Sequence, residues 1–276
     1  LAILVATGRK DLIFWKDISL GTLKLIFIIT GIVLNAPLDY FVYLGFINCA
    51  VLLILFLYMR HKEHGGYLVS KPRIAESLFF IRQGAVFTVL MAANVIYNKI
   101  DIIMLEKMKG SIEVGYYSGA TRFIYPFMFI STAFMTALFP SLAKYSNDKL
   151  KFSSIQNLAL YTLGFIGIIL STLLFFGSTF IFNSIFQDKY DASIPVFRIL
   201  VWYLAIVFIY GSISNNLVAK GKVTFLVYLN IVMIVVNVIL NFLLIPKMGA
   251  KGAAISTLIC EVIILFSGMI YWNRVK

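Results

Sequence analysis

The chain has little charge, little cysteine and few acidic residues. Charged residues make up 13% of its 276 residues, about half the share that is usual in a soluble domain. Its two cysteines, Cys49 and Cys260, lie inside apolar runs and imply neither a disulfide framework nor a metal cluster. Basic residues outnumber acidic ones by 24 to 12. They fall mainly between apolar segments, which argues against nucleic-acid binding and indicates membrane topology.

Apolar residues make up most of the chain. They make up 61% of the chain, and the mean hydropathy is +0.94. A globule of this size cannot bury so much apolar surface, so lipid is the solvent that suits it. Eight segments approach the roughly 20 residues that a helix needs to cross a bilayer: 18–34, 38–58, 76–98, 114–139, 155–182, 193–216, 223–245 and 251–272. They lack the alternation of membrane strands. We therefore predict an all-α, polytopic helical bundle.

The basic residues of the loops predict the orientation of the bundle. Loops on one side carry 14 Lys and Arg, and loops on the other side carry 5. The richer side is expected to be cytoplasmic, and it includes the C-terminus. The localisation that follows is the cytoplasmic membrane, with many passes and short loops.

A weak internal repeat predicts the domain organisation. The segments Val5–Arg9 and Val218–Lys222 are similar, and each precedes two apolar helices, the second of which ends at a basic residue. A parallel duplication of this kind occurs in transporters. We expect 1–60 to be the end of an N-terminal lobe, 61–75 a cytoplasmic loop between lobes, and 76–276 a complete C-terminal six-helix lobe. The chain would then be a fragment that lacks four upstream helices.

Five basic residues fall within or at the edge of apolar segments: Lys24, Arg82, Lys99, Arg122 and Arg198. A charge at the centre of a membrane helix costs about 2.5–3.5 kcal/mol on insertion scales, so it usually faces a cavity or a partner. Snorkelling to the headgroups is the alternative, and it suits Lys24 well. Lys99 can simply cap the outer end of its helix. Arg122 is the hardest to explain by snorkelling, since it lies roughly 12 Å inside its segment at 1.5 Å per residue.

Polar side chains also lie within the apolar segments. Gln83, Asn94, Asn98 and Asp101 share one helical face at 100° per residue, and Asn230, Asn237 and Asn241 form a second stripe. Such asparagines commonly form hydrogen bonds between helices. The alternative is that Asn94 and Asn98 contact the substrate. Glu261, alone in the last segment, is either protonated, paired with a base or part of an ion-coupling site. Asp101 and Glu261 are the ion-coupling candidates.

The sign of these charges predicts the class of substrate. Within the segments, basic residues outnumber the one clear acid, Glu261. A cationic cavity suits an anionic group such as a phosphate or pyrophosphate, which arginine binds in a bidentate manner. We expect Arg82, Lys99, Arg122 and Arg198 to be candidates for substrate binding. No cofactor or bound metal is expected.

Several motifs give the chain a family resemblance. They are Asp101–Leu105, Val114–Ala120, Ala120–Arg122 with Pro126, Thr136–Leu142 and Gly249–Ala254. In this order and spacing they resemble the Wzx-type polysaccharide flippases of the MATE-like (MOP) superfamily and the related lipid II flippases. The resemblance implies a fold of two six-helix lobes. It implies that Arg122 faces the central cavity, because the arginine of the lipid II flippases does so in a similar context.

The resemblance implies that the protein flips a polyprenyl-diphosphate-linked oligosaccharide for cell-surface polysaccharide biosynthesis. Its partners would be this anionic glycan lipid, membrane lipids and a coupling ion, Na⁺ or H⁺, with no nucleic acid. A cation-coupled multidrug antiporter on the same fold is the first alternative, and it would need acids deep in the lobes. A membrane-embedded polymerase or glycosyltransferase is the second. We expect no enzyme, because the outer loops are short and His61 and His64 lie in a basic loop.

Overall fold

The computed structural model describes residues 21–22, 25–37, 39–40, 43, 46–47, 50–51, 54, 74–186 and 190–275, without the side chains of 74–84, 86 and 87. The chain divides into two compact units, Leu1–Ser77 and Leu78–Lys276. In the first unit, residues 25–33 are helical, and the described residues between 39 and 54 are helical as well. The repeat segment Val5–Arg9, Lys24 and the loop that holds His61 and His64 lie outside the described residues.

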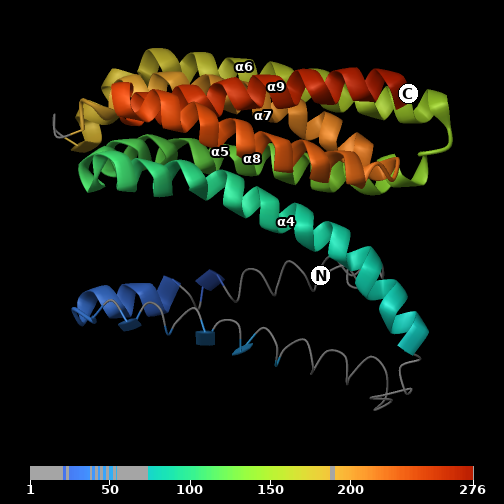
Figure 1. Cartoon of the computed structure of the whole chain (residues 1–276), viewed down its shortest axis with the longest axis horizontal. Coiled ribbons are helices and arrows are strands. Elements are labelled where there is room, and N and C mark those ends of the chain that lie inside the picture. The colour runs from blue at the N-terminus through green and yellow to red at the C-terminus, as the bar shows by residue number, and fades with distance from the viewer. Residues whose placement is uncertain are drawn as a thin grey trace. The chain divides into compact units, whose positions relative to one another are not determined.

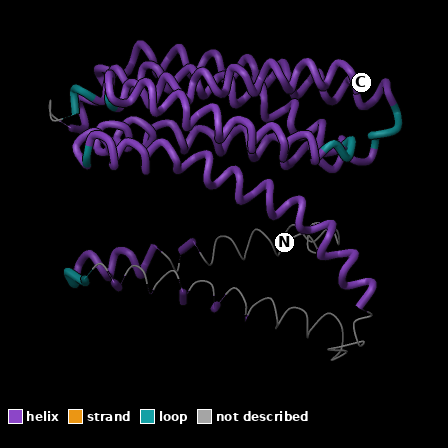
Figure 2. The backbone as a smooth tube through the Cα atoms, viewed as in Figure 1, coloured by secondary structure: helices purple, strands orange, loops and turns teal. Residues whose placement is uncertain are grey.

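The second unit is a bundle of long helices, the first of which begins four residues before the unit does (Figure 1). They are α4 (Ile74–Lys109), α5 (Ser111–Lys144), α6 (Lys149–Phe186), α7 (Ser193–Ala219), α8 (Val223–Met248) and α9 (Ala250–Val275). Each contains a stretch long and apolar enough to cross a membrane, which in α4 is Thr88–Lys109. Figure 2 shows helices joined by short loops, and the described residues contain no strand. The prediction of an all-α membrane bundle is confirmed.

Helix α7 is the centre of the bundle. It packs against α5, α6 and α9, and small residues allow the close approach that membrane helices use. Gly167 on α6 faces Ala205 and Phe208 on α7, and a Cβ at this glycine would lie 2.9 Å from Phe208 Cβ. Large apolar side chains such as Phe176 and Phe180, both 78% exposed, cover the outside of the bundle. This outer surface suits lipid and would be unfavourable in water.

Helix α4 continues beyond the end that the apolar pattern predicts. The expected segment ends at Asn98, whereas the helix runs to Lys109 and stops before Gly110, which has φ of 85°. The expectation that Lys99 caps the outer end of the helix is therefore wrong. The helix continues because the acid that interrupts the apolar run, Asp101, is buried and hydrogen-bonded rather than left in lipid. This extension places Asp101 inside the span.

Candidate functional site

Asp101 is the centre of a buried polar cluster. Its side chain is 4% exposed, and it accepts hydrogen bonds from three other helices. Tyr117 on α5 donates to Asp101 Oδ2 at 3.0 Å, and Thr257 on α9 donates to the same oxygen at 2.7 Å. Asn241 on α8 donates its Nδ2 to Asp101 Oδ1 at 2.6 Å. These hydrogen bonds replace those that the carboxylate would make to water if it were exposed. Asp101 therefore links its own helix, α4, to α5, α8 and α9.

Two asparagines on α8 extend this cluster. Asn237 and Asn241 lie one helical turn apart, and Asn241 Nδ2 also donates to Asn237 Oδ1 at 2.9 Å. Asn241 Oδ1 and Asn237 Nδ2 are buried and have no hydrogen-bond partner among the described residues. Unpaired buried polar atoms cost free energy, so each one needs a reason. Rotation of the Asn241 amide would turn its oxygen toward Asp101 and remove the donor that now occupies that place.

The oxygens of this cluster form a donor set for a cation. The carboxylate of Asp101, the hydroxyl of Thr257 and the side-chain oxygens of Asn237 and Asn241 are the kind of ligands that hard cations prefer. A cavity of about 20 Å³ adjoins Asp101, Tyr117 and Thr257, which is room for one water molecule or one small ion. We therefore identify this cluster as the candidate ion site.

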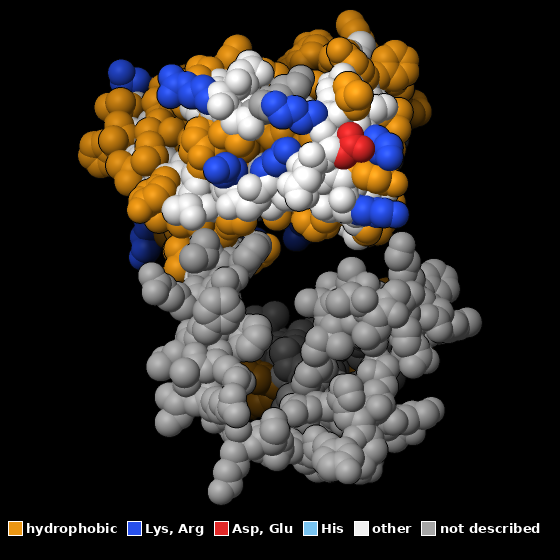
Figure 3. All heavy atoms as spheres, turned by 90° about the vertical axis from the view of Figure 1, so that its right-hand side faces the viewer, with side chains coloured by type: hydrophobic (Ala, Val, Ile, Leu, Met, Phe, Trp, Pro, Cys, Tyr) orange, Lys and Arg blue, Asp and Glu red, His pale blue; other side chains and the backbone are white. Residues whose placement is uncertain are grey.

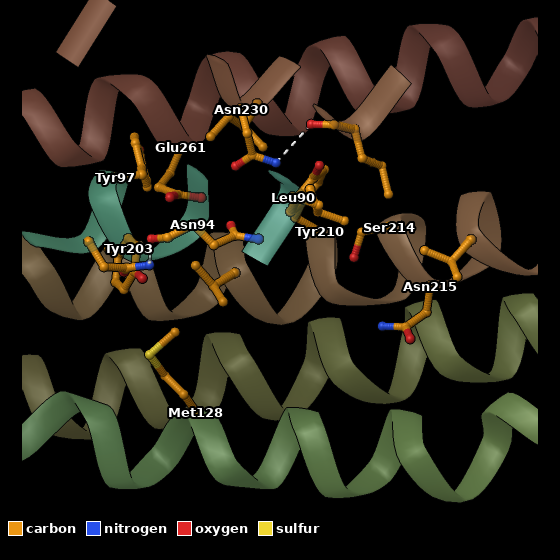
Figure 4. A pocket seen from close by; sticks show the side chains of 15 residues that line it. Leu90, Asn94, Tyr97, Met128, Tyr203, Tyr210, Ser214, Asn215, Asn230 and Glu261 are labelled. Atoms are coloured by element: carbon orange, nitrogen blue, oxygen red, sulfur yellow. Dashed lines mark hydrogen bonds between the residues drawn. The ribbon is translucent and has the colours of Figure 1, made fainter. Parts of the chain in front are cut away.

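A second and larger pocket lies beside the first (Figure 4). It has a volume of about 270 Å³, and its polar lining includes Asn94, Tyr97, Tyr210, Asn230 and Glu261. These side chains project from α4, α7, α8 and α9 toward the same space. Glu261 is 5% exposed. No Lys, Arg or His is among the described residues that line the pocket.

The two pockets share a wall. Tyr97, Asn98 and Tyr203 line both of them. Tyr97 and Tyr203 are buried, and Tyr97 Oη has no hydrogen-bond partner among the described residues. A change in the position of either ring would therefore change the shape of both pockets.

The structure brings some of the predicted residues together and separates others. Asn94, Asn98 and Glu261 line the larger pocket, and Asn98 and Asp101 line the smaller one. Lys99 and Arg122 are exposed and line neither pocket. The helix position of Arg82 is described, but its side chain lies outside the described part of the chain. Substrate contact by Arg82, Lys99 and Arg122 stays a prediction.

Arg198 is held by its neighbours on α6. Its Nε donates to Ser178 Oγ at 2.7 Å, and its Nη2 donates to Thr179 Oγ1 at 2.9 Å. The guanidinium also lies 5.7 Å from the ring centroid of Phe175, within the range of a cation–π contact. These contacts join α6 to α7, and Arg198 lines neither of the two pockets.

Sequence reasoning missed the residues that complete the pockets. Tyr117, Thr257, Tyr203 and Tyr210 are the main ones. Thr257 had a usable signal, because it precedes Glu261 by four residues and so lies on the same face of a helix. Tyr117 lies in the motif segment Val114–Ala120. Nothing in the sequence marks Tyr203 or Tyr210 among the 15 tyrosines.

The ends of the bundle carry most of the basic charge. Figure 3 shows the end at which α5, α7 and α9 finish, where Lys and Arg side chains gather. Lys144, Lys149, Lys151, Lys220, Lys222 and Arg274 belong to this end. At the opposite end, Lys109, Lys247 and Lys251 surround a cavity of about 530 Å³, and Glu113 there accepts a hydrogen bond from Ala250 N at 2.7 Å.

The fold and the buried polar pockets together define a class of protein. It is a polytopic helical membrane protein with polar sites between its helices, as transporters have. Residues 87–243 match the family model MatE, which is more than half of the chain. The chain belongs to the MatE family, so the resemblance to the MATE-like superfamily is confirmed. Residues 18–146 match a second model, described as polysaccharide biosynthesis protein. The MatE family consists of membrane transporters and flippases.

A solved structure has a similar fold. It is described as "Lipid II flippase MurJ, inward closed conformation", with a TM-score of 0.69 and 22% sequence identity. The match covers 90% of this chain and 54% of that one. The chain therefore spans about half the length of this structure, and the likeness confirms the MATE-like fold. No curated protein sequence matches the chain.

Proposed function

We propose that the chain is part of a flippase that moves a polyprenyl-diphosphate-linked oligosaccharide across the cytoplasmic membrane for cell-surface polysaccharide synthesis. Membership of the MatE family, the second match to polysaccharide biosynthesis proteins and the fold shared with a lipid II flippase support this class of cargo. The observation that carries the proposal is the buried polar interior of a bundle whose outside is apolar. A bundle with a purely structural role has no need to bury Asp101 and Glu261, each of which is costly in a membrane.

The proposed mechanism is alternating access between two six-helix lobes. Residues 76–276 form the C-terminal lobe in this proposal, 1–60 the end of the N-terminal lobe, and 61–75 the cytoplasmic loop between them. The basic end that holds Lys144, Lys220 and Arg274 lies in the cytoplasm, together with the C-terminus. Arg122 is exposed on the lobe, and it binds the pyrophosphate of the cargo.

The Asp101 cluster is proposed to bind the coupling ion. Its oxygens suit Na⁺, and the same carboxylate can take a proton instead. Ion occupancy would replace the Asn241 amide as the partner of Asp101, since both compete for Asp101 Oδ1. Because the cluster joins α4, α5, α8 and α9, its rearrangement is transmitted to four helices of the lobe.

The test is export of glycan from cells that lack the gene and carry the full-length protein on a plasmid. Export restored by the wild type and lost with Asp101→Asn, at an unchanged protein level, is the expected result. Glu106→Gln is the matched control, because Glu106 is an exposed acid on the same helix and lines neither pocket. Full glycan export in cells without the protein would contradict the proposal.

A second candidate function is a cation-coupled multidrug antiporter. The observation that favours it is Glu261, an acid deep in the lobe whose pocket has no basic residue in its described lining. Accumulation of a cationic dye in cells with and without the protein separates the two functions. Dye efflux without any change in glycan export would favour the antiporter.

A further inference from the structure

Arg198 lies on the outer surface of the bundle, within the span that α7 forms. It is eight residues from Ile206, the middle of this helix, which is roughly 12 Å along the axis at 1.5 Å per residue. The hydrocarbon core extends about 15 Å from the bilayer centre. A helix centred in the bilayer therefore places Arg198 just inside the layer of headgroups, where a base needs partners within its reach.

Two hydroxyls on α6 hold the guanidinium of Arg198 in place. Its Nε donates to Ser178 Oγ at 2.7 Å, and its Nη2 donates to Thr179 Oγ1 at 2.9 Å. The Ser178 hydroxyl donates its own hydrogen to the carbonyl of Phe175 at 2.8 Å, so it meets the arginine as an acceptor. A guanidinium has five N–H groups in one plane, and these two bonds use two of them. The edge between Nη1 and Nη2 keeps a parallel pair of N–H groups, which is the geometry that binds two oxygens of one phosphate.

The surface around Arg198 is apolar and aromatic. On α6, Phe176 and Phe180 are both 78% exposed, and the guanidinium lies 5.7 Å from the ring centroid of Phe175. Trp202, one turn after Arg198 on α7, is 41% exposed and lies against Phe175 with ring centroids 6.0 Å apart. Tryptophan is typical of the boundary between hydrocarbon and headgroups. The molecules that meet such a surface are membrane lipids, and phosphate is the group in them that an arginine fork binds.

The charge of Arg198 selects the kind of phosphate. Its described contacts are two hydroxyls and a ring, all of them neutral. Within the described residues, which leave out 187–189 before α7, no acid forms an ion pair with Arg198. One guanidinium balances the single charge of a phosphodiester, whereas a diphosphate carries more. Among phosphodiester lipids, phosphatidylglycerol keeps a net negative charge, and the amine of phosphatidylethanolamine cancels it.

We propose that Arg198 binds the phosphate of an anionic phospholipid. Ser178 and Thr179 position the guanidinium, and Trp202 borders the site at the level of the headgroups. The bound lipid lies across α6 and α7 and holds the two helices together. The orientation proposed above puts the site in the outer leaflet, and only this detail rests on the proposed function. The role differs from the contact with cargo that the sequence predicts for Arg198.

The experiment is native mass spectrometry of the purified full-length protein in detergent, with dioleoyl phosphatidylglycerol added in a concentration series. We expect the wild type to bind this lipid and Arg198→Ala to weaken the binding by about tenfold or more, because a pair of charge-assisted hydrogen bonds is lost. Arg274→Ala is the matched control, since it removes an exposed arginine at the opposite end of the bundle, and it should leave the affinity unchanged. Dioleoylglycerol has the same chains without a phosphate and should bind the wild type more weakly. Equal binding of the two lipids, or equal binding by the wild type and Arg198→Ala, would overturn the proposal.

Two milder variants keep the test independent of folding. Thr179→Val preserves the shape of an exposed side chain and removes the hydroxyl that fixes Nη2, so phosphatidylglycerol binding should weaken by about threefold. Arg198→Lys keeps the charge without the planar fork and should bind the lipid almost as weakly as Arg198→Ala. Wild-type affinity in both variants would show that charge alone attracts the lipid, and it would refute a built site.

A polyprenyl phosphate at the same concentrations tests the other lipid that carries this group. It should bind more weakly than phosphatidylglycerol, and tighter binding would assign the site to the carrier lipid instead. Glycan export by Arg198→Ala should remain close to that of the wild type. Loss of export at a normal protein level would give Arg198 a role in cargo binding and contradict the phospholipid site. Phospholipid binding by a wild-type protein that exports no glycan would support this site and refute the flippase.

Discussion

Thr257 and Glu261 lie one turn apart on α9 and line two different pockets. Thr257 donates to Asp101 in the candidate ion site, and Glu261 faces the larger pocket across the wall that Tyr97 and Tyr203 form. One face of one helix therefore serves both sites. A rotation of α9 about its axis would move both residues together and so change both pockets at once.

Loss of the Asp101 carboxylate should destabilise the lobe. Asp101→Leu removes the acceptor that Tyr117, Thr257 and Asn241 share, and a lost hydrogen bond to a charged group costs about 1.5–3 kcal/mol. Asp101→Asn keeps one acceptor oxygen and should cost less. Thermal unfolding in detergent measures the difference, and equal melting temperatures for the two variants would contradict the hydrogen-bond account.

Occupancy of the ion site should depend on Asn237 as well as on Asp101. Sodium is expected to raise the melting temperature of the wild-type protein, because a ligand stabilises the state that binds it. Asn237→Leu removes one oxygen ligand and should lower that sodium effect by at least half. Potassium at the same concentration controls for ionic strength. A sodium effect that survives in both Asn237→Leu and Asp101→Asn would place the ion elsewhere.

Arg122 should be required for export of the glycan. Arg122→Ala removes the charge that is proposed to bind the pyrophosphate, and export is expected to be lost while the protein level stays normal. Arg122→Lys should restore part of the export if charge alone matters, and little if bidentate geometry matters. Wild-type export by a well-expressed Arg122→Ala variant would exclude Arg122 from the substrate site.

Two glycines should respond in opposite ways to the same substitution. A Cβ at Gly252 would lie 2.5 Å from the carbonyl oxygen of Leu244, whereas a Cβ at Gly177 would meet only Ile181 Cδ1 at 3.6 Å. Gly252→Ala should therefore destabilise the α8–α9 contact by about 1–3 kcal/mol. Gly177→Ala should be neutral or stabilising, by up to about 1 kcal/mol, because alanine is the better helix former. Melting temperatures of the two variants check this pair.

The fold was predictable from the sequence because lipid imposes a simple rule. Each span must be a long apolar helix, and the six segments predicted between residues 76 and 272 lie within α4–α9. The end of α4 was not predictable in this way. In the sequence, Asp101 interrupts an apolar run and so suggests the end of a span. Its hydrogen-bond donors lie on other helices, and only tertiary packing brings them to it.

The candidate site was only partly predictable for the same reason. Asn241 and Thr257 lie 140 and 156 positions from Asp101, and no spacing rule in one sequence connects them. Composition indicated polar residues inside the spans, and Asn94, Asn98, Asp101 and Glu261 do line the pockets. The larger pocket has one acid and no base in its described lining, and the cationic cavity expected from Arg82, Lys99, Arg122 and Arg198 stays a prediction.

The wall shared by the two pockets has a thermodynamic consequence. If an ion at Asp101 shifts Tyr97 or Tyr203 and so changes the affinity of the neighbouring pocket by some factor, the ligand in that pocket must change the affinity for the ion by the same factor. A measured sodium dependence of ligand binding in the larger pocket would therefore fix the dependence of sodium binding on that ligand. Two aromatic side chains would then carry the free-energy exchange on which a coupled carrier depends.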